Sequence, residues 1–161
     1  MTAIRLASSA DAPAIWAILK PVLQAGETYT LPRDISEPEA LAYWCAPHHE
    51  TCVAHDGADV KGTYYLRANQ AGGGDHVANC GYMTAANTQG KGIARAMLEH
   101  SLERARQRGF RAMQFNFVVS TNERPIRTWQ TYGFAEVGRL PLAFKHPTVG
   151  FVDALLTFKQ L

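Results

Sequence analysis

Apolar residues recur along the chain at two spacings, one typical of helices and one typical of strands. Helical spacing covers Ile15–Leu23, before Gly26, and Leu41–Trp44, after Ser36 and an acidic first turn. Two further helices are predicted at 94–102 and 122–132. Strand-like runs are predicted at 2–7, 51–54, 60–67, 76–83, 112–119, 134–138 and 150–158. The predicted order is therefore β-α-α-β-β-β-α-β-α-β-β.

This order is typical of a mixed α/β fold with a largely antiparallel start. The segment Asp56–Asp59 has the composition of a hairpin turn between two strands. The helix at 94–102 lies between two strands and predicts one parallel crossover. With 161 residues, no repeat and no linker, we expect a single domain over residues 1–161.

The segment Gln89–Ala94 lies between a predicted strand and a predicted helix and carries Gly90 and Gly92. Glycines let the backbone turn tightly and approach a ligand, and the first amides of a helix lack internal partners. Such a loop can bind phosphate groups. The dinucleotide-binding spelling G-x-G-x-x-G fails because Arg95 stands at its last position, and no G-x-x-x-x-G-K-[ST] string occurs. The plain alternative is a glycine-rich turn before a surface helix.

The remaining spelling, Q-x-x-G-x-A, resembles the acyl-coenzyme A loop of the GNAT superfamily of N-acetyltransferases. A second GNAT pattern, N-x-x-A-x-x-L-Y-x-x-x-G-F, follows the next strand, and Asn122, Gly133 and Phe134 fall in register with it. Three positions of that pattern differ: Pro125 replaces alanine, Thr128 replaces leucine and Trp129 replaces tyrosine. Two motifs in the family's order are more specific than either alone.

The resemblance implies the GNAT fold, a mixed and mostly antiparallel sheet with a splayed central pair of parallel strands, flanked by helices. It also implies acetyl-coenzyme A (acetyl-CoA) as co-substrate, with its pantetheine arm in the splay. The Lys91 ammonium group is expected in solvent, because the amides suffice to hold the phosphates. The residues expected at the cofactor are Tyr82, Met83, Thr84, Gln89, Gly90, Lys91, Gly92, Ile93, Ala94, Asn122 and Trp129.

The groups that would move protons depart from the family pattern. Many GNAT enzymes carry a glutamate on the strand before the loop, and Val77–Met83 contains no carboxylate. Trp129 stands where a tyrosine commonly protonates the departing thiolate, and an indole cannot supply that proton. Tyr132 is either a substitute acid or a core residue. Gly81 either marks a β-bulge that turns an amide toward the oxyanion or relieves a crowded sheet.

Asn79 and Asn116 stand in otherwise apolar strands, where an amide must be hydrogen-bonded. They either pair with backbone across the splay or line the substrate pocket. Asn122 is either a site residue or the N-cap of its helix. The chain most resembles the yeast-type L-azetidine-2-carboxylate (proline-analogue) acetyltransferases and their bacterial relatives. The resemblance implies catalytic roles for Asn79, Asn116 and Trp129, and substrate-binding roles for Thr28, Tyr29, Asn79, Asn116 and Phe117.

We therefore predict acetyl transfer to a small amine by direct attack in a ternary complex, the amine being an amino or imino acid such as a proline analogue. An α-amino group has a reference pKa of about 8, against about 10.4 for lysine, so such an acceptor needs no strong base. The alternatives are a catalytically weak acyl-CoA-binding module, or an acetyltransferase for protein N-termini or polyamines.

Composition limits the ligands and the cellular environment that we expect for the protein. A net charge of +2 is too small to indicate nucleic acid or a membrane surface. The three cysteines form no C-x-x-C pair and have no metal-ligand spacing with the histidines, so we expect no metal and a reducing cytoplasm. No apolar run approaches the roughly 20 residues of a membrane span. Because the edge strands predicted near the C-terminus can pair with another chain, we expect a homodimer.

Overall fold

The computed structural model describes residues 2–161 and contains one seven-stranded sheet with the strand order β1-β2-β3-β4-β5-β7-β6. Neighbouring strands are antiparallel except β4 and β5, which are parallel. The predicted order of elements and the GNAT fold class are confirmed. The helices are α1 (Ala12–Ala25), α2 (Glu37–Trp44), α3 (Ile93–Gln107) and α4 (Glu123–Thr131). The strands are β1 (Ala3–Leu6), β2 (Glu50–Asp56), β3 (Asp59–Ala68), β4 (Val77–Thr84), β5 (Ala112–Val119), β6 (Ala135–His146) and β7 (Gly150–Gln160).

Local signals account for the ends of the first two helices. Gly26 adopts a left-handed conformation (φ 67°) and donates its N–H to Leu23, which ends α1 as the sequence predicts. Ser36 and Glu39 form a reciprocal capping box at the start of α2. Both signals act within a few residues, so the sequence alone is sufficient to predict them.

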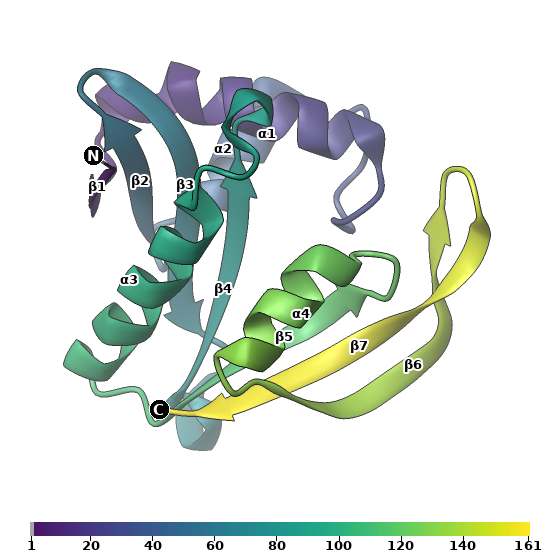
Figure 1. The fold of residues 1–161 in the computed structure, drawn as a ribbon. Coiled ribbons are helices and arrows are strands. Elements are labelled where there is room, and N and C mark those ends of the chain that lie inside the picture. Colours follow the sequence, from purple (N-terminus) through teal and green to yellow (C-terminus); the bar gives the residue numbers. More distant parts are fainter. Residues whose placement is uncertain (1) are drawn as a thin grey trace.

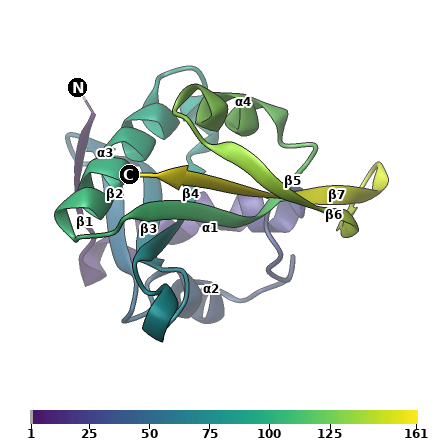
Figure 2. The same ribbon diagram turned by 90° about the horizontal axis from the view of Figure 1, so that it is seen from below.

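Helices cover both faces of the sheet, and each covered face has its own core (Figures 1 and 2). Helix α3 packs on the face formed by Tyr64, Leu66 and the alternate residues of β4, with Met97 and Leu98 fully buried. Helices α1 and α2 cover the opposite face, where Trp44 is fully buried. Strand alternation therefore assigns the odd-numbered residues of β3 and β4 to the α1–α2 face.

The parallel strands β4 and β5 separate soon after they start. Only Val77 with Ala112 and Ala78 with Met113 pair between the described residues of the two strands. Figure 1 shows β4 rising toward α1 while β5 runs away beneath α4. Beyond the pairing, backbone groups on the facing edges of both strands have no ladder partner, so they are available to side chains or to a ligand.

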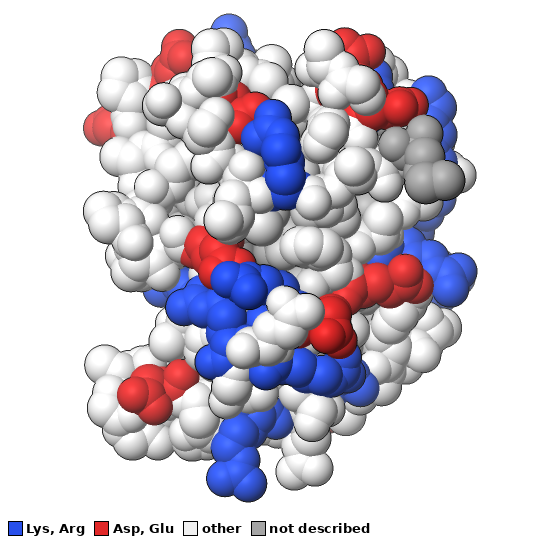
Figure 3. Space-filling model, turned by 90° about the vertical axis from the view of Figure 1, so that its left-hand side faces the viewer, with Lys and Arg blue, Asp and Glu red and all other residues white. Residues whose placement is uncertain are grey.

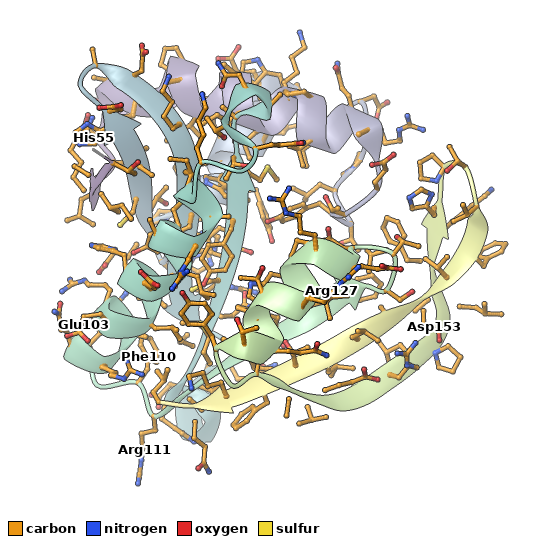
Figure 4. The ribbon with its side chains drawn as sticks, in the orientation of Figure 1. His55, Glu103, Phe110, Arg111, Arg127 and Asp153 are labelled. Carbon is orange, nitrogen blue, oxygen red and sulfur yellow. The ribbon has the colours of Figure 1, made fainter. Side chains whose placement is uncertain are left out.

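The sequence prediction for β6 was wrong, because the strand continues to His146 instead of ending at Gly138. Its pairing with β7 shifts register between Leu140 and Phe144, which marks a bulge. Within this bulge Leu142 has a positive φ of 51°, and its N–H donates to the Asp153 carboxylate at 2.9 Å. In Figure 4, Asp153 lies on the hairpin that projects from the body of the molecule.

Basic side chains at the end of α3 lie among acidic ones. Arg104 and Arg108 both pair with Glu50, and Arg106 pairs with Glu103. Figure 3 shows this side of the molecule, with blue and red side chains next to one another. Three arginines share two carboxylates there, so most of their positive charge is compensated locally.

Candidate functional site

A cleft of about 900 Å³ opens where β4 and β5 separate. Its lining combines the α1–α2 loop, both splayed strands, the start of α3 and the start of α4. Segments distant in the sequence meet there only because the sheet brings them together. Of the predicted site residues, Thr28, Tyr29, Asn79, Tyr82, Met83, Thr84, Gln89, Gly90, Gly92, Ile93, Ala94, Asn116, Phe117, Asn122 and Trp129 line this cleft.

The loop between β4 and α3 leaves its backbone open toward the cleft. Gly90 and Gly92 have φ values of 77° and 76°, and a Cβ atom built on either would meet no atom within 4 Å. The first helical hydrogen bond runs from Ala96 N–H to Gly92, so within the described chain the amides of Ile93, Ala94 and Arg95 donate to no protein acceptor. Open space and unpaired amides fit a phosphate group.

Lys91 is the loop residue that the structure does not bring into the cleft. Its side chain is exposed and does not line the cavity, and its amide donates to Thr88 at 3.2 Å. Arg95 in the first turn of α3 and Arg124 in the first turn of α4 do line the cleft and supply positive charge there. Arg95 shares the Glu99 carboxylate with Tyr132.

Helix α4 contributes Asn122 and Trp129 to the cleft wall. Asn122 stands at the N-cap position, yet its side chain makes no capping hydrogen bond. The indole of Trp129 packs on Phe115 with ring centroids 4.7 Å apart, so one face of Trp129 belongs to the core. Tyr132 packs its ring on the same core, donates its hydroxyl to Glu99 and does not itself line the cleft. Its geometry therefore does not favour the substitute-acid interpretation.

Both strand asparagines lie at the splay. Asn79 is 5% exposed, and its Nδ2 donates to the carbonyl of Gln114 at 2.9 Å, which joins β4 to β5 just beyond their last backbone pair. Asn116 donates to Asn69 at 2.5 Å and accepts from the Gln114 side chain at 2.9 Å. Asn79 therefore pairs with backbone across the splay and also lines the cleft. Asn116 lines the cleft too, but its partners are side chains, so the expected pairing with backbone is not found for it.

The Tyr29 hydroxyl occupies the free edge of β4. It donates to the Tyr82 carbonyl and accepts from the Tyr82 N–H, both at 2.9 Å. These two backbone groups face the gap left by β5, and a strand-like ligand would pair with them. Burial raises the pKa of Tyr29 far above its usual value, so the phenol stays protonated.

Gly81 does not form a β-bulge, so that sequence interpretation was wrong. The β3–β4 register is regular from Gly62–Thr84 to Ala68–Ala78, and Gly81 pairs with Tyr65. A Cβ atom on Gly81 would lie 2.6 Å from Cε1 of the Tyr65 ring. The glycine therefore makes room for that ring, which is the crowded-sheet interpretation. The register shift lies instead on β5, between Phe115 and Val118.

The described part of β4 offers no titratable group suited to a base. Cys80 lines the cleft, but burial raises the pKa of its thiol to about 12, so it remains a neutral thiol. Tyr82 points its hydroxyl to Ser101 on the α3 side, 2.7 Å away. Glu27 is the carboxylate among the described lining residues, and it is exposed on the α1–α2 loop.

Sequence reasoning missed Tyr43, Tyr65 and Arg67, which line the cleft around Asn79. Tyr65 is 4% exposed and stacks on His49, with ring centroids 4.2 Å apart. Arg67 pairs with Asn79 in the β3–β4 register. A signal was present: Arg67 follows Thr63 and Tyr65 at a spacing of two, so it belongs to a covered face.

The profile of the Acetyltransferase (GNAT) family matches residues 14–134. The chain belongs to this family. It is therefore an acetyl-CoA-dependent N-acetyltransferase. No group of three or more His, Cys, Asp or Glu side chains between residues 2 and 161 is arranged to hold a metal ion.

Individual relatives agree with this assignment. A GCN5-related N-acetyltransferase from Kribbella flavida is 36% identical, with a TM-score of 0.95 over 99% of this chain and 98% of that one. The N-acetyltransferase aca1 of Schizosaccharomyces pombe is 28% identical over 83% of this GNAT acetyltransferase and 72% of its own length. YncA from Salmonella typhimurium, solved with its cofactor acetyl-CoA, is 22% identical, with a TM-score of 0.85 over 99% of this chain and 94% of that one. At that identity it shows a shared fold.

Proposed function

We propose that this GNAT acetyltransferase, a single domain over residues 1–161, acetylates the amine of a small amino or imino acid such as a proline analogue. The observation that carries the proposal is the amide-rich, carboxylate-poor surface around Asn79 and Asn116 in the cleft. Polyamines carry several positive charges and require acidic side chains for binding, and the described cleft offers one exposed carboxylate, Glu27.

The proposed donor site consists of the loop amides of Gln89–Ala94, the edge of β4 at Tyr82–Thr84, and Asn122 and Trp129 on α4. Unpaired amides at the start of α3 suit the phosphates, and the β4 edge suits the amides of the pantetheine arm. Acetyl-CoA supplies a thioester-activated acetyl group. Because Tyr29 occupies both free backbone groups of Tyr82, a donor that pairs with that residue must displace the Tyr29 hydroxyl.

The proposed acceptor site consists of Thr28, Tyr29, Asn79, Asn116 and Phe117. Asn79 is held by Gln114, so its amide has a fixed orientation and can position an amine without reorganising. An amide is no base, and the acceptor must therefore reach the site in its neutral form or lose its proton to water. Trp129 would form part of the wall of the donor site, and the coenzyme A thiolate would leave unprotonated, with water stabilising its charge.

Direct attack in a ternary complex is supported by the state of Cys80. A covalent acetyl-cysteine intermediate requires a thiolate nucleophile, and burial keeps the pKa of this thiol near 12. Cys52, on the neighbouring strand, is also buried with a raised pKa. The buried free thiols further support a reducing, cytoplasmic setting.

A homodimer is also proposed, through the projecting β6–β7 hairpin. Val137, Leu142, Val149 and Phe151 on this hairpin are each more than 60% exposed, and β6 is a free sheet edge. A second copy of this surface would cover both features. Sedimentation of the protein as a monomer at micromolar concentration would contradict this part of the proposal.

The experiment is thiol release from acetyl-CoA over a panel of amines that includes L-azetidine-2-carboxylate, L-proline, the common amino acids, spermidine and an N-terminal peptide. Wild type should turn over at least one small amino or imino acid. Asn79→Ala should lower kcat/KM by about 10- to 100-fold, the effect of losing one orienting hydrogen bond in a buried site. Asn87→Ala, an exposed amide outside the cleft, is the matched control. Turnover of spermidine or peptide alone refutes the proposal.

A further inference from the structure

Arg67 is a half-buried arginine without a carboxylate partner. Seven of the other arginines in the described chain are ion-paired. The remaining three are exposed, so solvent screens their charge: Arg33, Arg111 and Arg124. Among the arginines of residues 2–161, Arg67 alone is both partly shielded from solvent and without a carboxylate within salt-bridge distance. A charge in that position costs free energy unless a ligand supplies the missing counter-charge.

The guanidinium is held at the cleft by Asn79. Arg67 Nε donates to Asn79 Oδ1 at 3.3 Å, and Asn79 donates in turn to the carbonyl of Gln114. A guanidinium has five N–H donors in a fixed fork, and this contact uses one. Both residues line the cleft together with Tyr43, Tyr65 and Asn116. The remaining donors therefore lie in a site walled by aromatic rings and amides.

The phosphates of the donor lie too far away to be that missing anion. Arg67 pairs with Asn79 near the start of β4, whereas the loop that fits phosphate begins after Thr84. Thr84 lies five residues beyond Asn79 along the strand, a distance of about 16 Å. Arg95, in the first turn of α3, lines the cleft next to the loop and provides positive charge there. The anion that suits Arg67 therefore belongs to the acceptor.

We propose that Arg67 binds the carboxylate of the acceptor, which restricts the substrates to amino and imino acids and excludes simple amines. This inference rests on the proposed function and deepens it. An arginine fork matches a carboxylate with two parallel hydrogen bonds, and it places the carboxylate in a defined orientation. Arg67 and Asn79, which are paired in the β3–β4 register, lie three residues, about 10 Å, before Tyr82 along β4. Tyr82 is the reference point because its free backbone groups are where the donor would pair. An extended arginine side chain and a small amino acid together span that distance.

The test compares acids with their own amides. kcat/KM is measured for L-azetidine-2-carboxylate, L-proline and the primary amide of each, in wild type and in Arg67→Gln. The acid-to-amide ratio is compared between enzymes, because this comparison cancels the intrinsic reactivity of each amine. The ratio should fall by about 10- to 150-fold in Arg67→Gln, the loss of a charge-assisted hydrogen-bonded pair. Most of the change should come from KM of the acid.

Two further variants separate binding from structure. Arg67→Lys keeps the charge and loses the fork, so it should restore part of the ratio. Arg111→Gln removes an equal charge at an exposed residue just before the start of β5, outside the cleft lining. Figure 4 shows this side chain pointing into solvent, and its loss should leave the ratio unchanged. If Arg67 acted only on folding, acid and amide would lose equally and the ratio would not move; that result overturns the inference.

A wild-type enzyme that uses acids and amides equally well also overturns the inference, while leaving acetylation of small amines intact. Failure of wild type to acetylate any panel member would instead refute the proposed function. In that case calorimetry on the coenzyme A-loaded protein decides the matter. Binding of L-proline or L-azetidine-2-carboxylate that is lost in Arg67→Gln supports the carboxylate site, and equal binding or no binding to the two proteins overturns it.

Discussion

Replacing Gly81 by alanine should disturb the acceptor end of the cleft through a single ring. The added Cβ would lie 2.6 Å from Cε1, 2.8 Å from Cζ and 2.9 Å from the hydroxyl of Tyr65. Carbon atoms in contact prefer about 3.5–4.0 Å, so the ring must move by about 1 Å. It cannot move freely, because His49 stacks on it at 4.2 Å and Trp44 meets it edge-on at 4.9 Å.

The expected loss follows from that confinement. Inserting a methyl group into a packed interior costs about 1–3 kcal/mol of unfolding free energy. For a chain of this length each kcal/mol lowers Tm by about 2–4 °C, which gives a decrease of about 2–12 °C. Since Tyr65 lines the cleft beside Asn79, KM for the acceptor should rise while KM for acetyl-CoA stays constant.

Gly138→Ala is the matched control, because its Cβ would meet Leu156 at an ordinary 3.4 Å. Alanine is itself preferred to glycine in a strand by roughly 0.5–1 kcal/mol, so this control should be neutral or slightly stabilising. In a Tyr65→Leu background the penalty of Gly81→Ala should disappear, which a double-mutant cycle by urea denaturation measures. If Gly81→Ala unfolds at the same urea concentration as Gly138→Ala, the steric argument is refuted.

Two more predictions concern the loop and the acid limit of stability. Gly92→Ala should weaken acetyl-CoA binding about 10-fold and lose about 1 kcal/mol of stability, because alanine resists a φ of 76°. Gly57→Ala, at φ 59° in the β2–β3 turn, should lose similar stability without affecting binding, and calorimetry with melting curves distinguishes the two. The hydrogen bonds from Arg5 lower the pKa of the buried Asp11 carboxylate far below its usual value. This stabilisation is complete above the unfolded pKa of about 3.9 and is lost as pH falls toward the folded value, so Asp11→Asn should flatten the decline of stability below about pH 5; equal slopes in urea titrations of the two proteins would contradict this.

The sequence predicts elements well where the determining contacts are local. The αL glycine after α1 and the capping box of α2 each involve residues at most three apart. The sequence does not predict the full length of β6, because the strand continues through a bulge in which Asp153 binds a backbone amide. That carboxylate binds the amide of Leu142 from eleven residues away, on a different strand. No local composition around Leu142 specifies such a contact.

The same distinction between local and long-range contacts applies to the residues of the candidate site. The loop and the start of α4 are contiguous motifs, and their residues reach the cleft as predicted, with Lys91 as the exception. Arg67 and Tyr65 belong to no motif. They enter the site because the β3–β4 register places them opposite Asn79 and Gly81, and that register is a property of the paired sheet. The two interpretations of Gly81 stayed open for the same reason, because the Tyr65 ring that decides between them lies on the neighbouring strand.

Arg67 bears on the missing carboxylate of β4, because its charge affects the pKa of the amine that the site would bind. In water, the carboxylate of an amino acid stabilises the adjacent ammonium group and so opposes its deprotonation. A carboxylate paired with a guanidinium offers less of that stabilisation, and the positive charge of Arg67 itself disfavours a second cation nearby. The two effects have the same sign, and both lower the pKa of the bound amine. A site that binds the carboxylate through Arg67 therefore increases the neutral fraction of the acceptor, which reduces its need for the glutamate that β4 lacks.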